Sequence, residues 1–288
     1  EEAAVTGLFS KDVILPCLFP PDGDEVIYWK KGNKDVHSYY YRQDQLGNQH
    51  LDYRNRTHLF YENIPHGNAS LKLSNLNLSD EGRYDCYVGT TQTKTEVEVM
   101  LHVRVRSCYA MEYRKTDAKR MLICSAFLTY PTPNVTWVRG NTSIQETGRE
   151  ETRDGVLSSV RSNQDIINTS DTYFCHIHLP HEDWTAEWSM QDQLSKAEGS
   201  NAVIPCEYSS NTLRTDGFSV AWKLNKNEVV SVLASFNGTF HSYQPRVQMN
   251  ENNFSLHVRD LTVDDGGDYL CNISTPSYTK LCVTPLQV

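Results

Sequence analysis

The residues of this chain that could do chemistry are one cluster of histidines and eight cysteines. The stretch HIHLPHED brings His176, His178, His181 and Asp183 close together in the sequence. Metal hydrolases hold zinc with His-x-His spacing, because alternate residues of a strand share a face. No acid–base pair follows at a recognisable spacing, and no Gly-x-Ser-x-Gly, P-loop or dinucleotide motif occurs. We therefore expect satisfied or solvated histidines, and no enzyme, metal or cofactor.

The cysteines favour disulfides over a metal centre, since none forms a Cys-x-x-Cys pair or is spaced with histidines as in a zinc finger. Nine Asn-x-Ser/Thr sequons in 288 residues indicate glycosylation in the secretory pathway, where disulfides persist. The sequence thus predicts an extracellular protein. The expected glycosylation sites are Asn55, Asn68, Asn77, Asn134, Asn141, Asn168, Asn237, Asn253 and Asn272.

The charge balance argues against nucleic acid as a partner. The formal net charge is -9, from 36 acidic and 27 basic side chains, and no basic stripe is present to neutralise phosphates or anionic lipid. No apolar run approaches the roughly 18 residues of a transmembrane helix, and the chain opens without a signal-peptide pattern. We expect the outer part of a membrane protein whose signal peptide and anchor are absent here.

A threefold repeat of cysteine, tryptophan and tyrosine relates the cysteines to strands. The first cysteine of each unit lies in an apolar run, a tryptophan follows it, and the second cysteine follows a tyrosine by two residues. In an immunoglobulin-type sandwich this pattern is a disulfide between strands B and F, a strand C tryptophan packed against it and a tyrosine corner. The predicted sets are Cys17–Cys86 with Trp29 and Tyr84, Cys124–Cys175 with Trp137 and Tyr173, and Cys206–Cys271 with Trp222 and Tyr269.

The motif Asp-x-Gly-x-Tyr-x-Cys occurs twice, as DEGRYDC from Asp80 and as DGGDYLC from Asp265. The glycine allows a tight turn between strands E and F, and the aspartate can pair with an arginine at the start of strand D. We therefore predict the ion pairs Arg56–Asp80 and Arg246–Asp265, and a structural role for the motif.

The cysteine separations sort the repeated units into domain types. Separations of 69 and 65 residues leave room for the extra strands of a variable-type domain, whereas 51 residues indicate a constant-type domain. We predict an all-β chain of three tandem immunoglobulin-like sandwiches, variable-type at 1–104, constant-type at 105–192 and variable-type at 193–288. The linkers are short and poor in Gly and Ser, which predicts a stiff rod.

Several stretches, spread over essentially the whole chain, resemble the B-seven and butyrophilin group of costimulatory ligands. They are VIYWKKGNKDVHSYYYRQDQL, YRNRTHLF, GNASLKLSNLNLSDEGRYDCYVGT, LICSAFLTYPTPNVTW, WTAEWSM and GDYLCNIS. The resemblance implies a type I membrane glycoprotein on the surface of antigen-presenting or epithelial cells. It also implies an immunoglobulin-type receptor on T or natural killer cells, a CD28 homologue or a killer-cell immunoglobulin-like receptor, and co-stimulation or inhibition of the lymphocyte. A homophilic adhesion protein or a receptor stays the alternative, because immunoglobulin folds host all of these.

Ligands of this family present the front sheet of the membrane-distal domain, strands G, F, C, C′ and C″, to the receptor. With Trp29 and Cys86 pointing inward, strand alternation turns their neighbours outward, Asp85 among them. Exposed tyrosines suit recognition because they offer a large contact area at low rotamer entropy. The predicted receptor-binding residues are Tyr28, Lys30, Tyr40, Tyr87, Gly89, Thr90, Thr91 and Gln92.

The positions of the sequons support this face. Asn55, Asn68 and Asn77 fall on the opposite sheet or its margins, so their glycans would leave the front sheet of 1–104 open. A glycan on Asn237 would instead cover part of the corresponding face of 193–288.

Two cysteines, Cys108 and Cys282, lie outside the repeated pattern. A disulfide needs α-carbons within about 7 Å, and a straight rod would hold these two strands further apart. We expect free thiols or intermolecular crosslinks, with a bent chain that joins the two as the alternative.

Overall fold

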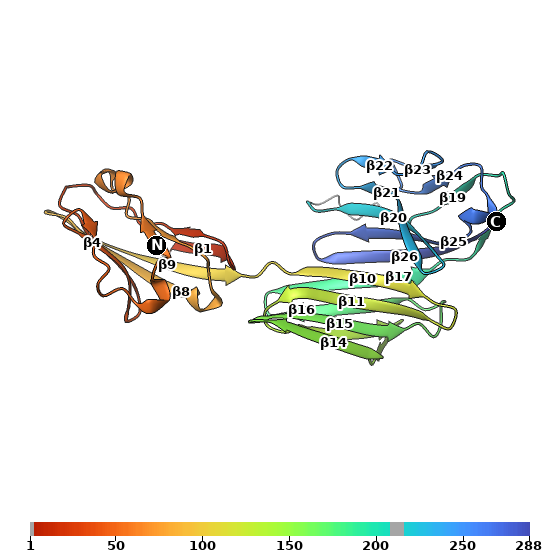
Figure 1. Ribbon diagram of the computed structural model, residues 1–288, viewed down its shortest axis with the longest axis horizontal. Helices are drawn as coiled ribbons and strands as arrows, with labels where there is room; N and C mark the ends of the chain where they lie inside the picture. The colour runs from red at the N-terminus through yellow and green to blue at the C-terminus, as the bar shows by residue number, and fades with distance from the viewer. Residues whose placement is uncertain (1–2, 208–215) are drawn as a thin grey trace. The chain divides into compact units, whose positions relative to one another are not determined.

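The computed structural model describes residues 3–207 and 216–288, which form β-strands and a few short 3₁₀ helices, so the chain is all-β. It divides into two compact units, residues 1–106 and residues 107–288 (Figure 1). Among the described residues, no helix is long and apolar enough to cross a membrane.

Residues 1–106 form two sheets around one core. The larger, called the front sheet below, has the strand order β1 (Ala3–Leu8), β9 (Lys94–Arg104), β8 (Gly82–Gly89), β3 (Val26–Lys31), β4 (Lys34–Tyr40) and β5 (Gln43–Asp44). The smaller has the order β2 (Val13–Leu15), β7 (Leu71–Leu73) and β6 (Thr57–Leu59). The 3₁₀ helices are η1 (Leu51–Tyr53), η2 (Tyr61–His66) and η3 (Leu78–Asp80).

The core of residues 1–106 follows from alternation along these strands. On β3 the side chains of Ile27 and Trp29 are fully buried, beside the Cys17–Cys86 disulfide. The indole of Trp29 donates a hydrogen bond of 2.9 Å to the carbonyl of Ala69, two residues before β7 of the smaller sheet, which satisfies its buried N–H. The disulfide and the tryptophan together fix the spacing of the two sheets.

The turn before β8 shows why the Asp-x-Gly-x-Tyr-x-Cys motif is needed. Asp80 pairs with Arg56, and the hydroxyl of Tyr84 donates to the carbonyl of Asp80 at 2.8 Å. Gly82 has φ +136°, a conformation that other residues rarely adopt. The predicted Arg56–Asp80 pair is therefore confirmed.

The motif forms the same turn before β25 (Gly267–Ser274). Arg246 pairs with Asp265 at 2.9 Å, and Tyr269 donates to the carbonyl of Asp265 at 2.8 Å. In the middle unit, Tyr173 makes a related corner, because its hydroxyl accepts the backbone N–H of Ile167 at 3.1 Å. The predicted Arg246–Asp265 pair is thus also confirmed.

One long sheet runs through the described part of residues 107–288 and contains ten strands, several of which are labelled in Figure 1. Its order is β13 (Thr142–Ile144), β12 (Asn134–Arg139), β16 (Tyr173–Leu179), β17 (Glu182–Met190), β26 (Tyr278–Gln287), β25, β20 (Ser219–Lys226), β21 (Val229–Phe236) and β22 (Phe240–Ser242), with β18 (Leu194–Ser195) also paired to β26. A second sheet contains β10 (Cys108–Lys115), β11 (Arg120–Thr129), β15 (Leu157–Asp165) and β14 (Gly148–Asp154). A third contains β19 (Ala202–Ile204), β24 (Leu256–Val258) and β23 (Val247–Met249), and η4 (Val263–Asp265) precedes β25.

The two smaller sheets cover opposite faces of the shared sheet. Leu281 belongs to the core that contains Trp137 and the Cys124–Cys175 disulfide, whereas Cys282 belongs to the core that contains Trp222 and the Cys206–Cys271 disulfide. Successive strand residues point to opposite faces, so two cores lie on the two sides of one sheet. The three disulfides are the pairs that the sequence pattern predicts.

The stiff rod predicted from the short linkers is wrong for residues 107–288. Strand β17 pairs in parallel with β26, with Thr185 opposite Tyr278 and Met190 opposite Val283. Both strands would otherwise present unpaired N–H and C=O groups at a sheet edge, and the pairing satisfies them. The segments on either side of residue 192 therefore lie side by side in one unit.

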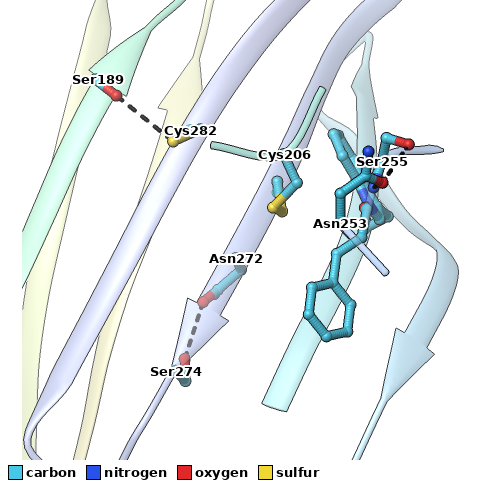
Figure 2. Close-up of a disulfide and its surroundings, with 10 residues drawn as sticks. Ser189, Cys206, Asn253, Ser255, Asn272, Ser274 and Cys282 are labelled. Atoms are coloured by element: carbon cyan, nitrogen blue, oxygen red, sulfur yellow. Dashed lines mark hydrogen bonds between the residues drawn. A yellow bond between two sulfur atoms is a disulfide. The ribbon is translucent and has the colours of Figure 1, made fainter. Parts of the chain in front are cut away.

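Cys108 and Cys282 are both free thiols. Cys108 is exposed at the start of β10. Cys282 lies on β26, where it is buried and stands opposite Cys271 of β25. The Cys282 Sγ lies 3.6 Å from the Ser189 hydroxyl oxygen (Figure 2). Burial raises the pKa of the Cys282 thiol, so it is poorly reactive. No disulfide joins Cys108 to Cys282, which agrees with the expectation of free thiols and not with the alternative in which a bent chain joins the two.

Candidate functional site

Two tyrosines lie at the centre of the front sheet of residues 1–106. Tyr28 on β3 stands directly opposite Tyr87 on β8, and the two side chains are 37% and 38% exposed. Both point away from the core because Trp29 and Cys86, their chain neighbours, point into it. Strand alternation alone places these residues as predicted.

A hollow next to Tyr28 adds two more tyrosine rings. The ring centroid of Tyr40 lies 6.2 Å from that of Tyr28 and 5.3 Å from that of Tyr41. The hollow has a volume of about 560 Å³, and Asp24, Glu25, Val26 and Arg42 line it together with the three tyrosines. The cluster therefore offers aromatic faces beside carboxylates, a surface suited to a cationic or aromatic group of a partner.

Sequence reasoning favours Tyr40 over its neighbours, but Tyr40 is half-buried whereas Tyr41 is 86% exposed. Tyr41 and Arg42 form the turn between β4 and β5, with φ of +54° and +59°. A two-residue hairpin with two positive φ angles ordinarily carries Asn or Gly, so the sequence gives no signal for it.

Lys30 is exposed on β3, with its ammonium nitrogen 3.7 Å from a carboxylate oxygen of Asp35. Asp85 lies opposite Lys30 on β8, but it is only 8% exposed, so it is not the accessible residue that alternation predicts. The guanidinium of Arg83 approaches the Asp85 carboxylate to 3.1 Å and also pairs with Glu98 at 3.3 Å. The long arginine side chain thus covers Asp85.

The hydroxyl groups of the loop after β8 make hydrogen bonds within the loop and to Asp22. Gly89 ends β8, and the Thr90 and Thr93 hydroxyl oxygens lie 2.8 Å apart. Thr91 donates at 2.8 Å to the carboxylate of Asp22, and both Thr91 and Gln92 are exposed. A loop ordered before binding loses less conformational entropy when it contacts a partner.

Carboxylates shape the electrostatics of this face. Glu96 stands opposite Tyr87 on β9, and its hydrogen bond to the phenol raises the pKa of Tyr87. Tyr87 is therefore neutral at physiological pH and available as a hydrogen-bonding group. Sequence reasoning missed Glu96, although cross-strand pairing of a tyrosine with a glutamate follows once the register is known.

The three sequons of residues 1–106 lie outside the front sheet. Asn55 is between η1 and β6, Asn68 forms a bridge with Leu18 before β7, and Asn77 is the N-cap of η3. Asn55 and Asn77 are exposed and Asn68 is half-buried. Of the remaining sequons, Asn272 is half-buried and the others are exposed. Glycans at the first three positions would leave the front sheet uncovered.

The histidine cluster lies on β16 and does not converge on one point. The His176 ring nitrogen lies 3.0 Å from the Thr185 hydroxyl, and that of His178 lies 2.7 Å from the Asp183 carboxylate. Partial burial, and then His178, lower the pKa of His176. His181 is exposed after β16. Across residues 3–207 and 216–288, no group of three or more His, Cys, Asp or Glu side chains is arranged to hold a metal ion.

Known proteins resemble the chain in sequence. A family model for the immunoglobulin V-set domain matches residues 1–106 and 189–288. The human HERV-H LTR-associating protein 2 is 36% identical over 100% of this chain and 72% of its own length. The human V-set domain-containing T-cell activation inhibitor 1 is 30% identical over 71% of this chain and 72% of its length, and human ICOS ligand is 26% identical over 58% and 60%. The chain therefore belongs to the immunoglobulin V-set family, within its B-seven and butyrophilin group.

Proposed function

We propose that this chain is the extracellular part of a cell-surface ligand that binds an immunoglobulin-type receptor on T or natural killer cells and modulates lymphocyte activation. The names of two relatives, a T-cell activation inhibitor and a ligand of ICOS, support this role. A CD28 homologue and a killer-cell immunoglobulin-like receptor are the candidate partners. The membrane anchor would lie in a segment outside this sequence.

The domain plan that we propose is variable-type at 1–104, constant-type at 105–192 and variable-type at 193–288. Three separate cores, each with its own disulfide and buried tryptophan, support three domains. The V-set match to the first and last parts of the chain, and not to residues 107–188, supports the assigned types. In this plan the first domain is the membrane-distal one.

The observation that carries the receptor-binding role is the exposed tyrosine surface on the front sheet of residues 1–106. Tyr28, Tyr40, Tyr41 and Tyr87 are contiguous, the neighbouring loop is hydrogen-bonded to Asp22, and no sequon lies among them. Interface hot spots are enriched in tyrosine because its rigid ring buries much area at low entropic cost. We infer a binding role and no catalytic one, since this surface is an open strand face that offers contacts to a protein partner.

Staining of transfected cells tests the proposal. Fluorescent tetramers of the 1–288 protein are applied to a panel of cells that each express one lymphocyte receptor, and to cells that express this protein itself. Selective staining of one receptor line, lost with Tyr28→Ala and kept with Tyr243→Ala, is expected; Tyr243 is also an exposed tyrosine but lies outside residues 1–106. Staining confined to cells that carry this protein would show a homophilic adhesion protein and would contradict the ligand role.

A further inference from the structure

A groove of about 600 Å³ runs along strand β10 within residues 107–288. One wall is β10, with Met111 and Tyr113, and the floor is the shared sheet, with Leu270 and Leu281. The wall is fixed to the floor, because the Tyr113 hydroxyl donates to the buried carboxylate of Asp268 at 3.1 Å. Cavities of about 300–1,000 Å³ are large enough to hold a ligand of drug size.

The floor of this groove is apolar but only partly covered. Leu270 and Leu281 are buried at the side of β10. Further from β10, Val230 and Val232 on β21 are 50% and 45% exposed. Lys223 on β20 stands opposite Val232 of β21 on one side and opposite Leu270 of β25 on the other. Residues directly opposite each other point to the same face, so these three side chains share one face of the sheet. Two partly exposed valines therefore lie beside the groove on one face of the sheet, where an occupant of the groove would remove their apolar area from water.

Asn272 stands on this floor, on β25, opposite Leu281 of β26 and opposite Ala221 of β20. It begins the sequon Asn272-Ile273-Ser274. Its side-chain oxygen accepts a hydrogen bond of 2.9 Å from the Ser274 hydroxyl (Figure 2). The asparagine oxygen is therefore engaged with the sequon serine, while the amide nitrogen is the atom that carries a glycan.

We propose that an N-linked glycan on Asn272 lies in this groove and covers Val230 and Val232. In its formation the amide nitrogen loses a proton and bonds to C1 of the first N-acetylglucosamine, while the bond from C1 to a lipid diphosphate donor breaks and the lipid diphosphate leaves. The attachment precedes folding, so the half-buried position of Asn272 in the folded chain does not prevent it.

The chemistry of the groove matches such a glycan. The acetyl methyl and the C–H faces of the sugar rings pack on Val230 and Val232, which removes apolar area from water. The hydroxyl and acetamide groups meet polar side chains of the lining, Lys223, Asn225, Glu112 and Glu228. This face of the shared sheet, over β25, β20 and β21, would then be closed to a protein partner, whatever residues 1–106 bind.

Protection of the glycan and of the groove tests this inference with the full 1–288 protein made in mammalian cells. Mass spectrometry measures occupancy of Asn272, and peptide N-glycosidase F is applied to the native protein. We expect Asn272 to be occupied and its glycan to be released several-fold more slowly than that of the exposed Asn253. An unoccupied Asn272, or release at the Asn253 rate, would overturn the proposal.

Acetylation of surface lysines provides a second readout. Asn272→Gln and Ser274→Ala remove the glycan, whereas Ser274→Thr keeps the sequon and is the matched control. Acetylation of Lys223 should rise several-fold in the first two variants and stay unchanged in the third, with the exposed Lys196 unchanged in all. Low acetylation of Lys223 in every variant would mean that the protein itself shields Lys223 from the reagent without any glycan, and would refute the role of the glycan.

Discussion

Replacing Asp80 by alanine should destabilise residues 1–106 by about 3 kcal/mol. The Asp80 side chain is 3% exposed, pairs with Arg56 and also accepts the backbone N–H of Asn77 at 2.8 Å. Breaking a buried ion pair costs about 3–5 kcal/mol, because one charge stays buried without its partner. In the Asp80→Ala variant, Arg56 keeps hydrogen bonds to the carbonyls of Ser74 and Asn75, at 3.1 and 3.2 Å. The expected cost is therefore at the low end of this range.

Differential scanning calorimetry of the 1–288 protein measures this loss. At about 4–8 °C per kcal/mol, the transition of residues 1–106 should fall by roughly 12–24 °C. Asp12→Ala is the matched control, because Asp12 pairs with Lys72 at 3.1 Å and accepts the backbone N–H of Asn75 at 3.1 Å on the exposed surface, so its loss should lower the transition far less. A shift of Asp80→Ala no larger than that of Asp12→Ala would refute the structural role of the motif.

Three further predictions concern residues 107–288 and the free thiols. Cys108 should react with a maleimide in the native protein and Cys282 only after unfolding, as peptide mapping would show; equal labelling would contradict the burial of Cys282. Asp268→Ala leaves the hydroxyl of Tyr113 without its buried acceptor and should lower the unfolding free energy of residues 107–288 by about 1–3 kcal/mol in denaturant titration. Burial raises the pKa of Asp265, but the hydrogen bonds and charge of Arg246 and the hydrogen bonds from the backbone N–H and hydroxyl of Thr262 together lower it more, so the net shift is downward. The ionised Asp265 carboxylate therefore stabilises the folded state above the unfolded pKa of about 3.9, and this stabilisation is lost as the pH falls through the folded pKa. Asp265→Asn should remove this part of the acid dependence of unfolding, which circular dichroism follows.

The cores and the positions of the central tyrosines could be predicted because they depend on local patterns. Alternation around Trp29 and Cys86 places Tyr28 and Tyr87 on the outer face, and the spacing of Asp80 from Cys86 identifies the turn. These signals lie within a few residues of each other and act through strand geometry.

The remaining features depend on contacts between distant segments. The parallel pairing of β17 with β26 joins two strands that have no distinctive sequence beyond apolar alternation, so the sequence suggested a rod. The burial of Asp85 depends on the conformation of Arg83, and the exposure of Tyr41 depends on a turn without Asn or Gly. Side-chain conformation and unusual backbone angles are set by the assembled structure.

The most direct test of receptor binding by the front sheet is the affinity of Tyr28→Ala and Tyr87→Ala for the receptor found by cell staining. If both are hot spots, each substitution should cost about 1–3 kcal/mol, or roughly 5- to 150-fold in Kd, with secretion and the unfolding temperature unchanged. Surface plasmon resonance of the 1–288 protein, with Tyr243→Ala as the control, measures this. Unchanged Kd in the double variant, or full binding by residues 107–288 alone, would contradict the assignment.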